Sequence, residues 1–207
     1  CVPATSFETS GGVIEASDVE ALFKQGAWFL AEMMNFPGVL NHDRSVWDKI
    51  EIAKRYQKPI DGHAPGLIGK DLAAYVGAGI STDHECSTIE EAIQRIKLGM
   101  FVQIREGSAA RNFNQLYTLL NTHPSSVMLC NDDSHPDDIA EKGHIDKIVR
   151  MALKRGVSIF DIYQAALVNP VLHYQLPVGM LRVGDRADFV VVDNLDDFII
   201  QSTYIDG

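Results

Sequence analysis

Short apolar runs alternate along the chain with longer segments in which apolar residues recur at helical spacing. The apolar runs lie near 28–31, 59–60, 80, 101–104 and 127–130, and each is followed by polar residues. Helical spacing is found over about 43–56, 67–76, 88–98, 112–120, 145–154 and 160–168. This alternation predicts an α/β protein made of βα units with a parallel sheet.

Polar residues ahead of several segments indicate where helices begin. Ser17 with Glu20, and Thr88 with Glu91, have the spacing of a capping box. The helix after Thr88 has the clearest amphipathic pattern. We expect it to bury a stripe of four apolar residues, which are Ile89, Ala92, Ile93 and Ile96.

The pattern changes after the last predicted helix. Ser158 can cap that helix, and we expect it to end at Asn169 because Pro170 does not continue a helix. Beyond it, glycines and aspartates separate short runs, of which 189–192 and 198–200 predict strands. We therefore divide the chain into an α/β part, residues 1–175, and part of a small β element, residues 176–207.

The composition of the chain excludes some classes of binding partner. The chain has 207 residues, of which 46% are hydrophobic and 22% charged, with a formal net charge of -10. Because no basic stretch offsets this charge, we expect neither a nucleic-acid partner nor an anionic membrane surface. No apolar run approaches the roughly 20 residues that span a bilayer, and no signal-peptide pattern is found. We expect a cytoplasmic protein.

Three cysteines form neither a CxxC pair nor an even-numbered framework: Cys1, Cys86 and Cys130. We interpret them as reduced thiols of a cytosolic protein. A catalytic or metal-ligand role for Cys86 or Cys130 is the alternative.

The polar residues at the ends of the apolar runs are the candidates for chemistry. They are Glu32, His63, His84, Arg105 with Glu106, and Asp132 with Asp133. In a TIM-like barrel the C-terminal ends of the strands converge on one mouth, so these side chains would lie together. Imidazoles and carboxylates are ligands of hydrolytic divalent metals such as zinc, manganese or iron.

Each of these residues also has a structural explanation. A single histidine after a strand is commonly a surface or capping residue, Glu32 can be a loop carboxylate, and Asp132-Asp133 can belong to a turn. The structural explanation is weaker for the whole set, because polar residues recur at the same end of every run. The other histidines lack this placement and are interpreted as structural: His42, His123, His135, His144 and His173.

Five of these segments resemble strand-end motifs of the adenine deaminase family, in the amidohydrolase superfamily. They read EMMNFPGV at 32–39, DGHAPG at 61–66, STDHE at 81–85, IREGSAA at 104–110 and CNDD at 130–133. They are similar to the family's fourth to eighth strands. The opening VPATSFETSG at 2–11 resembles the end of the third strand, and GMLRVGDRAD at 179–188 resembles the return into the small β-sandwich.

The resemblance implies a fold and a reaction. The fold would be a partial (β/α)8 TIM-like barrel, from about the third or fourth strand to the eighth, with part of the β-sandwich. The reaction would be metal-dependent hydrolytic deamination of adenine to hypoxanthine and ammonia, a step of purine salvage. The cofactors would be divalent metal ions, Mn, Fe or Zn, in a binuclear site of the complete enzyme.

The resemblance also implies roles for individual residues. Glu32, His63, His84 and Asp132 would be metal ligands. Asp132 would also move the proton, and Glu85 is a second candidate for proton handling. The substrate would be contacted by four further residues, which are Arg105, Glu106, Ser108 and Asp133.

One departure from the family affects the whole interpretation. The family has a His-x-His motif at its first strand, and this sequence contains none. About five βα units are present, whereas a complete barrel has eight in about 250 residues. We expect a fragment of a longer enzyme that associates with the missing N-terminal segment or with another copy of itself.

Two alternatives remain open from the sequence. The first is a metal-dependent amidohydrolase acting on another aminopurine or on a cyclic amide. The second is a truncated homologue without catalytic activity, which the missing His-x-His motif favours.

Overall fold

A computed structural model describes residues 3–4, 8–9 and 11–207 of the chain. The chain divides into two compact units, Cys1–Val102 and Gln103–Gly207, and each is described by itself. Cys1 and part of the predicted third-strand motif at 2–11 lie outside the described residues. The division between α/β part and β-sandwich at residue 175 stays a prediction.

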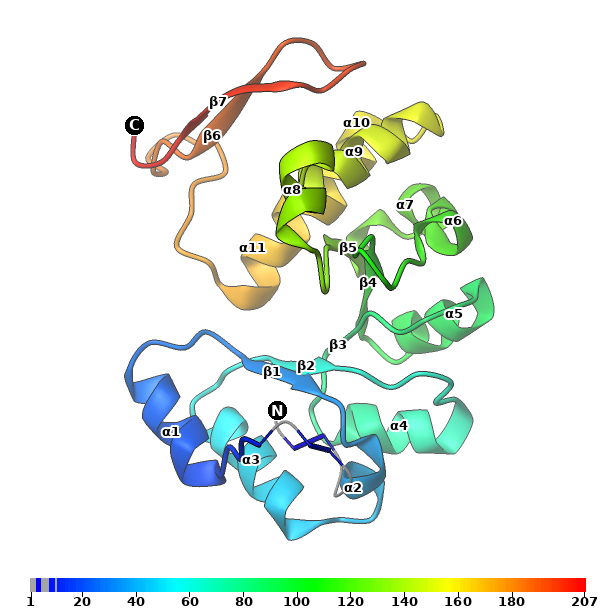
Figure 1. Cartoon of the computed structure of the whole chain (residues 1–207), viewed down its shortest axis with the longest axis vertical. Coiled ribbons are helices and arrows are strands. Elements are labelled where there is room, and N and C mark those ends of the chain that lie inside the picture. The colour runs from blue at the N-terminus through cyan, green and yellow to red at the C-terminus, as the bar shows by residue number, and fades with distance from the viewer. Residues whose placement is uncertain (1–2, 5–7, 10) are drawn as a thin grey trace. The chain divides into compact units, whose positions relative to one another are not determined.

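The first unit alternates short strands with helices, as the pattern predicts. Its elements are α1 (Ala16–Lys24), β1 (Leu30–Met33), α2 (Phe36–Leu40), α3 (Arg44–Arg55), β2 (Ile60–Gly62), α4 (Gly69–Gly77), β3 (Thr82–Asp83) and α5 (Ile89–Lys97). β1 and β2 pair in parallel, and helices α1 to α4 lie on one side of this pair (Figure 1). β3 pairs in parallel with the start of β4 (Phe101–Arg105), so the predicted parallel pairing is confirmed for these strands.

Two hydrogen bonds donated by backbone N–H groups connect β2 to β3. The Ser81 N–H donates to the Ile60 carbonyl at 2.9 Å, and the Gly62 N–H donates to the Thr82 hydroxyl at 3.3 Å. The ends of β1, β2 and β3 are therefore held in one neighbourhood by main-chain hydrogen bonds.

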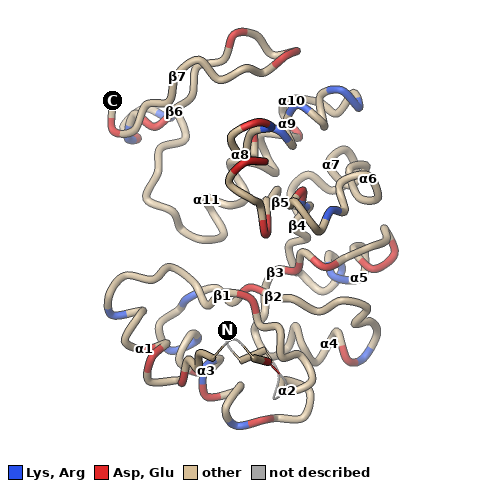
Figure 2. Tube along the Cα trace, viewed as in Figure 1, with Lys and Arg blue, Asp and Glu red and all other residues tan. Residues whose placement is uncertain are grey.

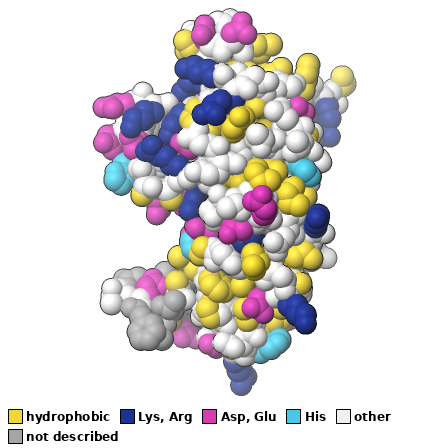
Figure 3. Space-filling model, turned by 90° about the vertical axis from the view of Figure 1, so that its right-hand side faces the viewer, with side chains coloured by type: hydrophobic (Ala, Val, Ile, Leu, Met, Phe, Trp, Pro, Cys, Tyr) yellow, Lys and Arg dark blue, Asp and Glu magenta, His cyan; other side chains and the backbone are white. Residues whose placement is uncertain are grey.

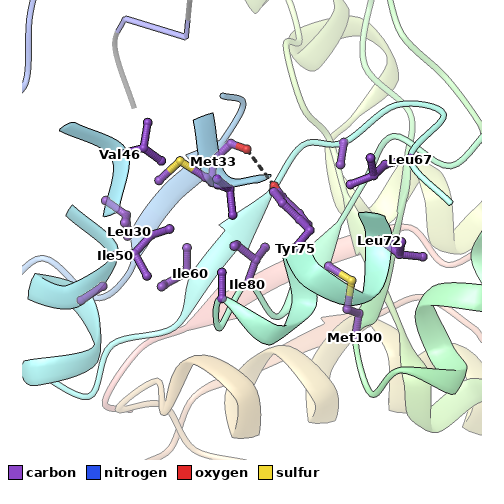
Figure 4. Packing of buried hydrophobic residues seen from close by; sticks show 14 of the residues in the cluster. Leu30, Met33, Val46, Ile50, Ile60, Leu67, Leu72, Tyr75, Ile80 and Met100 are labelled. Atoms are coloured by element: carbon purple, nitrogen blue, oxygen red, sulfur yellow. Dashed lines mark hydrogen bonds between the residues drawn. The ribbon is translucent and has the colours of Figure 1, made fainter. Parts of the chain in front are cut away.

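A continuous apolar cluster packs the strands against the helices. Leu30 and Ile60 on the strands lie beside Ile50 of α3, Leu72 of α4 belongs to the same cluster near Met100, and all of these side chains are almost completely buried (Figure 4). Burying one such side chain contributes roughly 1.5–3 kcal/mol, so the cluster holds the strand ends in fixed places.

The predicted capping boxes have different outcomes. At α5 the Thr88 hydroxyl accepts from the Glu91 N–H at 3.2 Å, which confirms the helix start. At α1 the box of Ser17 and Glu20 is wrong, because the helix begins two residues earlier. There the Asp18 carboxylate accepts from the Glu15 N–H at 2.8 Å, and Glu20 is left to pair with Arg55.

Helix α5 buries a different face from the one predicted. Ala92 is buried as expected, but Ile89, Ile93 and Ile96 are only half-buried. The other fully buried side chain of the helix is Arg95. The reason is an ion pair with buried Asp83, which outweighs the apolar pattern of the helix.

The second unit contains the rest of β4 and a helical layer. Its elements are α6 (Phe113–Leu116), α7 (Thr118–Thr122), η1 (Pro124–Ser126), β5 (Val127–Cys130), α8 (Pro136–Lys142), α9 (Ile145–Lys154), α10 (Ile159–Tyr163), η2 (Gln164–Val168), α11 (Asn169–Tyr174), β6 (Phe189–Val192) and β7 (Ile200–Tyr204). β5 lies beside β4, and the Glu106 N–H donates to the Cys130 carbonyl at 3.2 Å.

The predicted helix stop at Asn169 is wrong. The chain passes from α10 through the π-helical turn η2 directly into α11, and Pro170 occupies the first turn of α11. The π-helical turn directly before Pro170 interrupts the regular α-helical hydrogen-bond pattern at this point, where a proline lacks the N–H that an α-helix would use. The Asn169 amide donates to the carbonyls of Pro124 and Val127 at 2.8 and 2.6 Å, which anchors the junction to the preceding loop and strand.

The C-terminal segment forms an antiparallel hairpin of β6 and β7 (Figure 1). β6 is where the sequence predicts it, but the second strand begins at Ile200 instead of 198. Phe198 has a left-handed backbone (φ 51°) and its buried ring lies against Tyr163, so it ends the loop instead of pairing.

Charged and hydrophobic side chains are interspersed at the surface. Acidic and basic positions are interspersed along the trace without a continuous basic stretch (Figure 2). On the face shown in Figure 3, hydrophobic side chains reach the surface between charged ones. Within the part of the chain that the structure describes, no helix combines the length and apolar character needed to cross a bilayer.

We predict that Gly62→Ala destabilises the protein. A Cβ at this position would lie 2.3 Å from the Thr82 carbonyl oxygen and 2.8 Å from Ile80 Cγ2. Backbone must move to relieve this overlap, at a cost of about 1–3 kcal/mol in the free energy of unfolding. Urea denaturation measures the loss.

Gly77→Ala is the matched control, because a Cβ there meets no described atom within 4 Å. We expect it to be neutral or to stabilise by about 0.4–1 kcal/mol. Equal stability of the two variants would contradict the close approach of β2 and β3.

Candidate metal centre

Three of the predicted ligands converge in the first unit. Glu32 Oε2 lies 2.9 Å from His63 Nδ1 and 3.2 Å from His84 Nε2, and the two imidazole nitrogens are 3.3 Å apart. Among the described residues these three form a group whose ligand atoms lie close enough to share one metal ion. The sequence predicts that these three side chains lie together at neighbouring strand ends, and in the structure they do.

The strands explain why these residues meet. His63 follows β2 directly and His84 follows β3 directly, as predicted from the sequence. Glu32 differs slightly, because it lies inside β1 rather than after it. The parallel pairing of β1 with β2 sets Met33 opposite Gly62, so Glu32 and His63 project near the same edge.

Glu85 adds a fourth side chain with an atom that can donate a lone pair to a metal ion. Its Oε1 lies 3.2 Å from His63 Nδ1 and 3.5 Å from His84 Nε2. His63 Nδ1 thus faces three atoms that carry lone pairs, whereas an imidazole nitrogen can hold only one proton. Protons alone cannot satisfy every close pair in this cluster, but a cation at its centre can.

The spacing of the donors fits a metal ion. Zinc–nitrogen and zinc–oxygen bonds are about 2.0–2.2 Å long, so two ligands of one ion at ordinary angles are about 3.0–3.5 Å apart. The three measured separations, 2.9, 3.2 and 3.3 Å, agree with this value. Two histidines and a glutamate are also a ligand set found at catalytic zinc sites.

The electrostatics of the cluster favour bound cations. Hydrogen bonds from His63 and then His84 lower the pKa of Glu32 well below its usual range, although burial acts in the opposite direction. Glu32 is therefore a carboxylate at neutral pH. Burial raises the pKa of the neighbouring Cys86 thiol to about 12, so the neutral thiol is favoured at this position.

A buried hydroxyl connects two of the ligand-bearing segments. Tyr75 Oη donates to the Met33 carbonyl at 2.7 Å and accepts from the His63 N–H at 3.1 Å (Figure 4). Tyr75 is completely buried, and burial raises its pKa, so it remains neutral. It holds the backbone next to Glu32 against the backbone of His63.

In the second unit, Asp132 has an unusual conformation. Its backbone is left-handed (φ 54°), in a loop directly after β5. Arg105 Nη1 donates to Asp132 Oδ2 at 2.6 Å, and both side chains are mostly buried. Non-glycine residues held in this region are frequent at functional sites. Arg105, predicted to contact substrate, here pairs with Asp132.

Two of the three remaining predicted substrate residues line a small polar pocket. Glu106 and Ser108 line it together with Asn131, Asp138 and Lys147. Glu106 is buried, with Lys147 Nζ at 3.7 Å, and the Ser108 hydroxyl donates to Asp138. Within the described residues Asn131 Oδ1 is buried and has no hydrogen-bond donor. Asp133 is exposed and contributes its carbonyl, which accepts from the Ser108 N–H at 2.9 Å.

Sequence reasoning missed the residues that hold the ligands in place. Tyr75 looks like an ordinary apolar residue of a helix, and Arg95 looks like a solvated charge. For Asp83, the sequence signal of such a role was its position beside His84 in the STDHE segment. Their roles depend on contacts between distant segments, which no local pattern records.

Comparison with known proteins shows the family of the chain. A model of the amidohydrolase family matches residues 1–207, and the chain belongs to that family. Three relatives are named adenine deaminase: 55% identity to the protein of Methanosarcina acetivorans, 52% to that of Salinibacter ruber and 48% to that of Borreliella burgdorferi. Each match covers 100% of this chain, which spans only 38–39% of the relatives' length.

Solved structures show the same fold at low identity. The β-aspartyl dipeptidase of Fervidobacterium islandicum matches with a TM-score of 0.63 and 16% identity, over 93% of this chain and 58% of that one. The ochratoxinase of A. niger matches with 0.60 and 16%, over 98% and 58%. The α/β class and the amidohydrolase fold are thereby confirmed.

We predict that Tyr75→Phe destabilises the protein by about 1–3 kcal/mol, because it leaves the Met33 carbonyl and the His63 N–H without this buried partner. Tyr56→Phe is the control: its hydroxyl donates to Glu20 at 2.9 Å near the surface, and we expect a loss below about 1 kcal/mol. Thermal unfolding compares them. A Tyr75 variant as stable as the Tyr56 variant would contradict the bridging role.

Proposed function

We propose that the protein containing this chain is a metal-dependent adenine deaminase, which converts adenine and water to hypoxanthine and ammonia. The observation that carries the proposal is the convergence of Glu32, His63 and His84 at the strand ends. Support comes from relatives at 48–55% identity that bear this name. The proposal concerns the whole protein, because the chain spans 38% of the first relatives' length.

The fold of the complete protein would be a (β/α)8 barrel, to which this chain contributes about the third or fourth strand to the eighth. Residues 176–207, with the β6–β7 hairpin, would complete a small β-sandwich. The remaining ligands, including those of a His-x-His motif, would come from a further segment or from a second copy. The substrate, the oligomeric state and this association are part of the proposal.

Glu32, His63 and His84 would hold a divalent cation, Mn, Fe or Zn. When bound, such an ion supplies Lewis-acid chemistry that lowers the pKa of water toward about 7. The chain's own contribution is to keep Glu32 charged and the imidazole nitrogens facing one another, as found in the structure. Glu85, next to both imidazoles, would orient the water or move a proton.

Asp132 would be the general base and the fourth ligand. Its carboxylate would accept a proton from the water that adds to C6 of adenine and return it to the departing amine as ammonia. The ion pair with Arg105 fixes the direction of this carboxylate. Arg105, Glu106, Ser108 and Asp133 would contact the purine, since Arg105 ends β4 and the other three lie in the loops that follow β4 and β5.

We predict that His84→Ala lowers the metal content of the purified protein, tested in the full length that its gene encodes. The substitution removes one of three donors that lie within 3.3 Å of one another. Elemental analysis after dialysis measures bound Mn, Fe and Zn. His123→Ala is the control, because that ring lies 2.9 Å from the Thr122 hydroxyl and is not a predicted ligand. Parent-like metal content in His84→Ala would contradict the metal centre.

We predict that Asp132→Asn abolishes ammonia release from adenine without unfolding the protein. Asparagine tolerates a left-handed backbone, so the loop can keep its conformation while the base is lost. General-base catalysis contributes about 10²–10⁴ in rate, so kcat should fall by at least two orders of magnitude. Ammonia is measured by a coupled assay and the fold by circular dichroism.

The control is Asp137→Asn, an exposed residue in the first turn of α8. Other aminopurines and a cyclic amide are tested in parallel. Turnover of one of these substrates but not adenine would replace the proposed substrate within the same family. Unchanged turnover in Asp132→Asn would contradict the role of this residue, and metal-loaded parent protein without any turnover would favour a non-catalytic homologue.

A further inference from the structure

Asp83 and Arg95 form a buried ion pair beside the candidate metal centre. Arg95 Nε donates to Asp83 Oδ2 at 2.7 Å, and both side chains are completely buried. Removing two charges from water is expensive, and well-packed apolar side chains are often equally stable in such places. The pair therefore calls for a role other than stability.

The remaining hydrogen bonds of the pair point to that role. Arg95 Nη2 donates to the Ala64 carbonyl at 2.7 Å, and Asp83 Oδ1 accepts from the Ala64 N–H at 3.4 Å. Ala64 directly follows His63. Both polar groups of its backbone are thus held by one ion pair.

The same pair holds the segment of the second histidine. Asp83 directly precedes His84, and its Oδ1 also accepts from the Glu85 N–H at 2.9 Å. Arg95 Nη1 donates to the Glu91 carbonyl at 3.3 Å, which fixes the guanidinium to its own helix. The backbones beside His63 and His84 are in this way tied to each other and to α5.

We propose that Asp83 and Arg95 are positioning residues that set the separation of His63 and His84 for one shared metal ion. This inference rests on the proposed metal centre. The two imidazole nitrogens lie 3.3 Å apart, and a ligand constellation must be held within about 0.5 Å of its working geometry. The hydrogen bonds of Arg95 go to Asp83, Ala64 and Glu91 instead of the donor atoms of the predicted ligands, so Arg95 acts through Asp83 and Ala64.

Lysine cannot replace arginine in this arrangement. The guanidinium reaches Asp83, Ala64 and Glu91 with three different nitrogens in a fixed plane. A single ammonium keeps the charge beside Asp83 but cannot make these three contacts in the same geometry. Arg95→Lys therefore separates the charge of the residue from its bridging geometry.

The test measures metal affinity in Arg95→Lys and Arg95→Met, in the full-length protein and at a temperature where circular dichroism shows each variant folded. Loss of a residue that orients metal ligands typically weakens binding 10- to 100-fold. We expect the Zn²⁺ dissociation constant, measured by competition with a chelator, to rise at least tenfold in both variants. The absorption spectrum of the Co²⁺-loaded protein should also change, because it reports the ligand geometry.

Arg150→Met is the matched control. Arg150 also bridges a carboxylate and a carbonyl, with Nη1 at 2.6 Å from Asp146 and Nη2 at 2.8 Å from Lys142. It lies on α9 and should leave both the dissociation constant and the Co²⁺ spectrum unchanged. If Arg95→Met does not fold, Arg95→Lys alone still decides the question.

The outcomes separate this inference from the proposed metal centre. If His84→Ala weakens metal binding but folded Arg95 variants bind with parent affinity and an unchanged Co²⁺ spectrum, the ion pair only stabilises the fold and the inference is wrong. If the parent and His84→Ala bind metal equally, the metal centre itself is wrong and the inference falls with it.

Discussion

Parallel pairing of very short strands determines the candidate site. β1 pairs in parallel with β2, and the Ser81 N–H donates to the Ile60 carbonyl, which holds the start of β3 beside β2. These main-chain bonds bring Glu32, His63 and His84 to one neighbourhood. The close approach also explains Gly62, since a side chain there would overlap the Thr82 carbonyl. Once the strands are paired, the backbone positions of these three residues place their metal-donor atoms close together.

The donors are held by a second set of buried polar groups. Tyr75 connects the Met33 carbonyl to the His63 N–H, and the Asp83–Arg95 pair connects Ala64 to Glu85. Such groups are stable inside a protein only when their hydrogen bonds are satisfied, and a satisfied network has one geometry. The packing around it is apolar, so the network cannot relax by taking up water. The result is a rigid frame beneath a cluster that is suited to a cation.

The second unit contributes a different kind of constraint. Asp132 stands at the end of β5 with a left-handed backbone and an ion pair to Arg105, so its carboxylate is fixed in direction before any substrate is present. Glu106 and Ser108 are also occupied, by Lys147 and Asp138. Residues predicted to contact a substrate are thus already part of an internal polar network. This network is consistent with preorganised loops.

The sequence by itself determined the α/β class, most helix and strand positions, and the set Glu32, His63 and His84. Periodicity and strand ends are local signals, and parallel strands bring their ends together whatever the rest of the fold does. Only the tertiary structure decided that Arg95 is buried in place of the isoleucines of α5, because its partners Asp83 and Ala64 lie 12 and 31 positions away. It also decided that the helix continues through Pro170, since carbonyls 42 and 45 positions away receive the Asn169 amide. A local sequence pattern does not predict such contacts. Their free energy depends on which groups, far apart in the sequence, are buried together away from water.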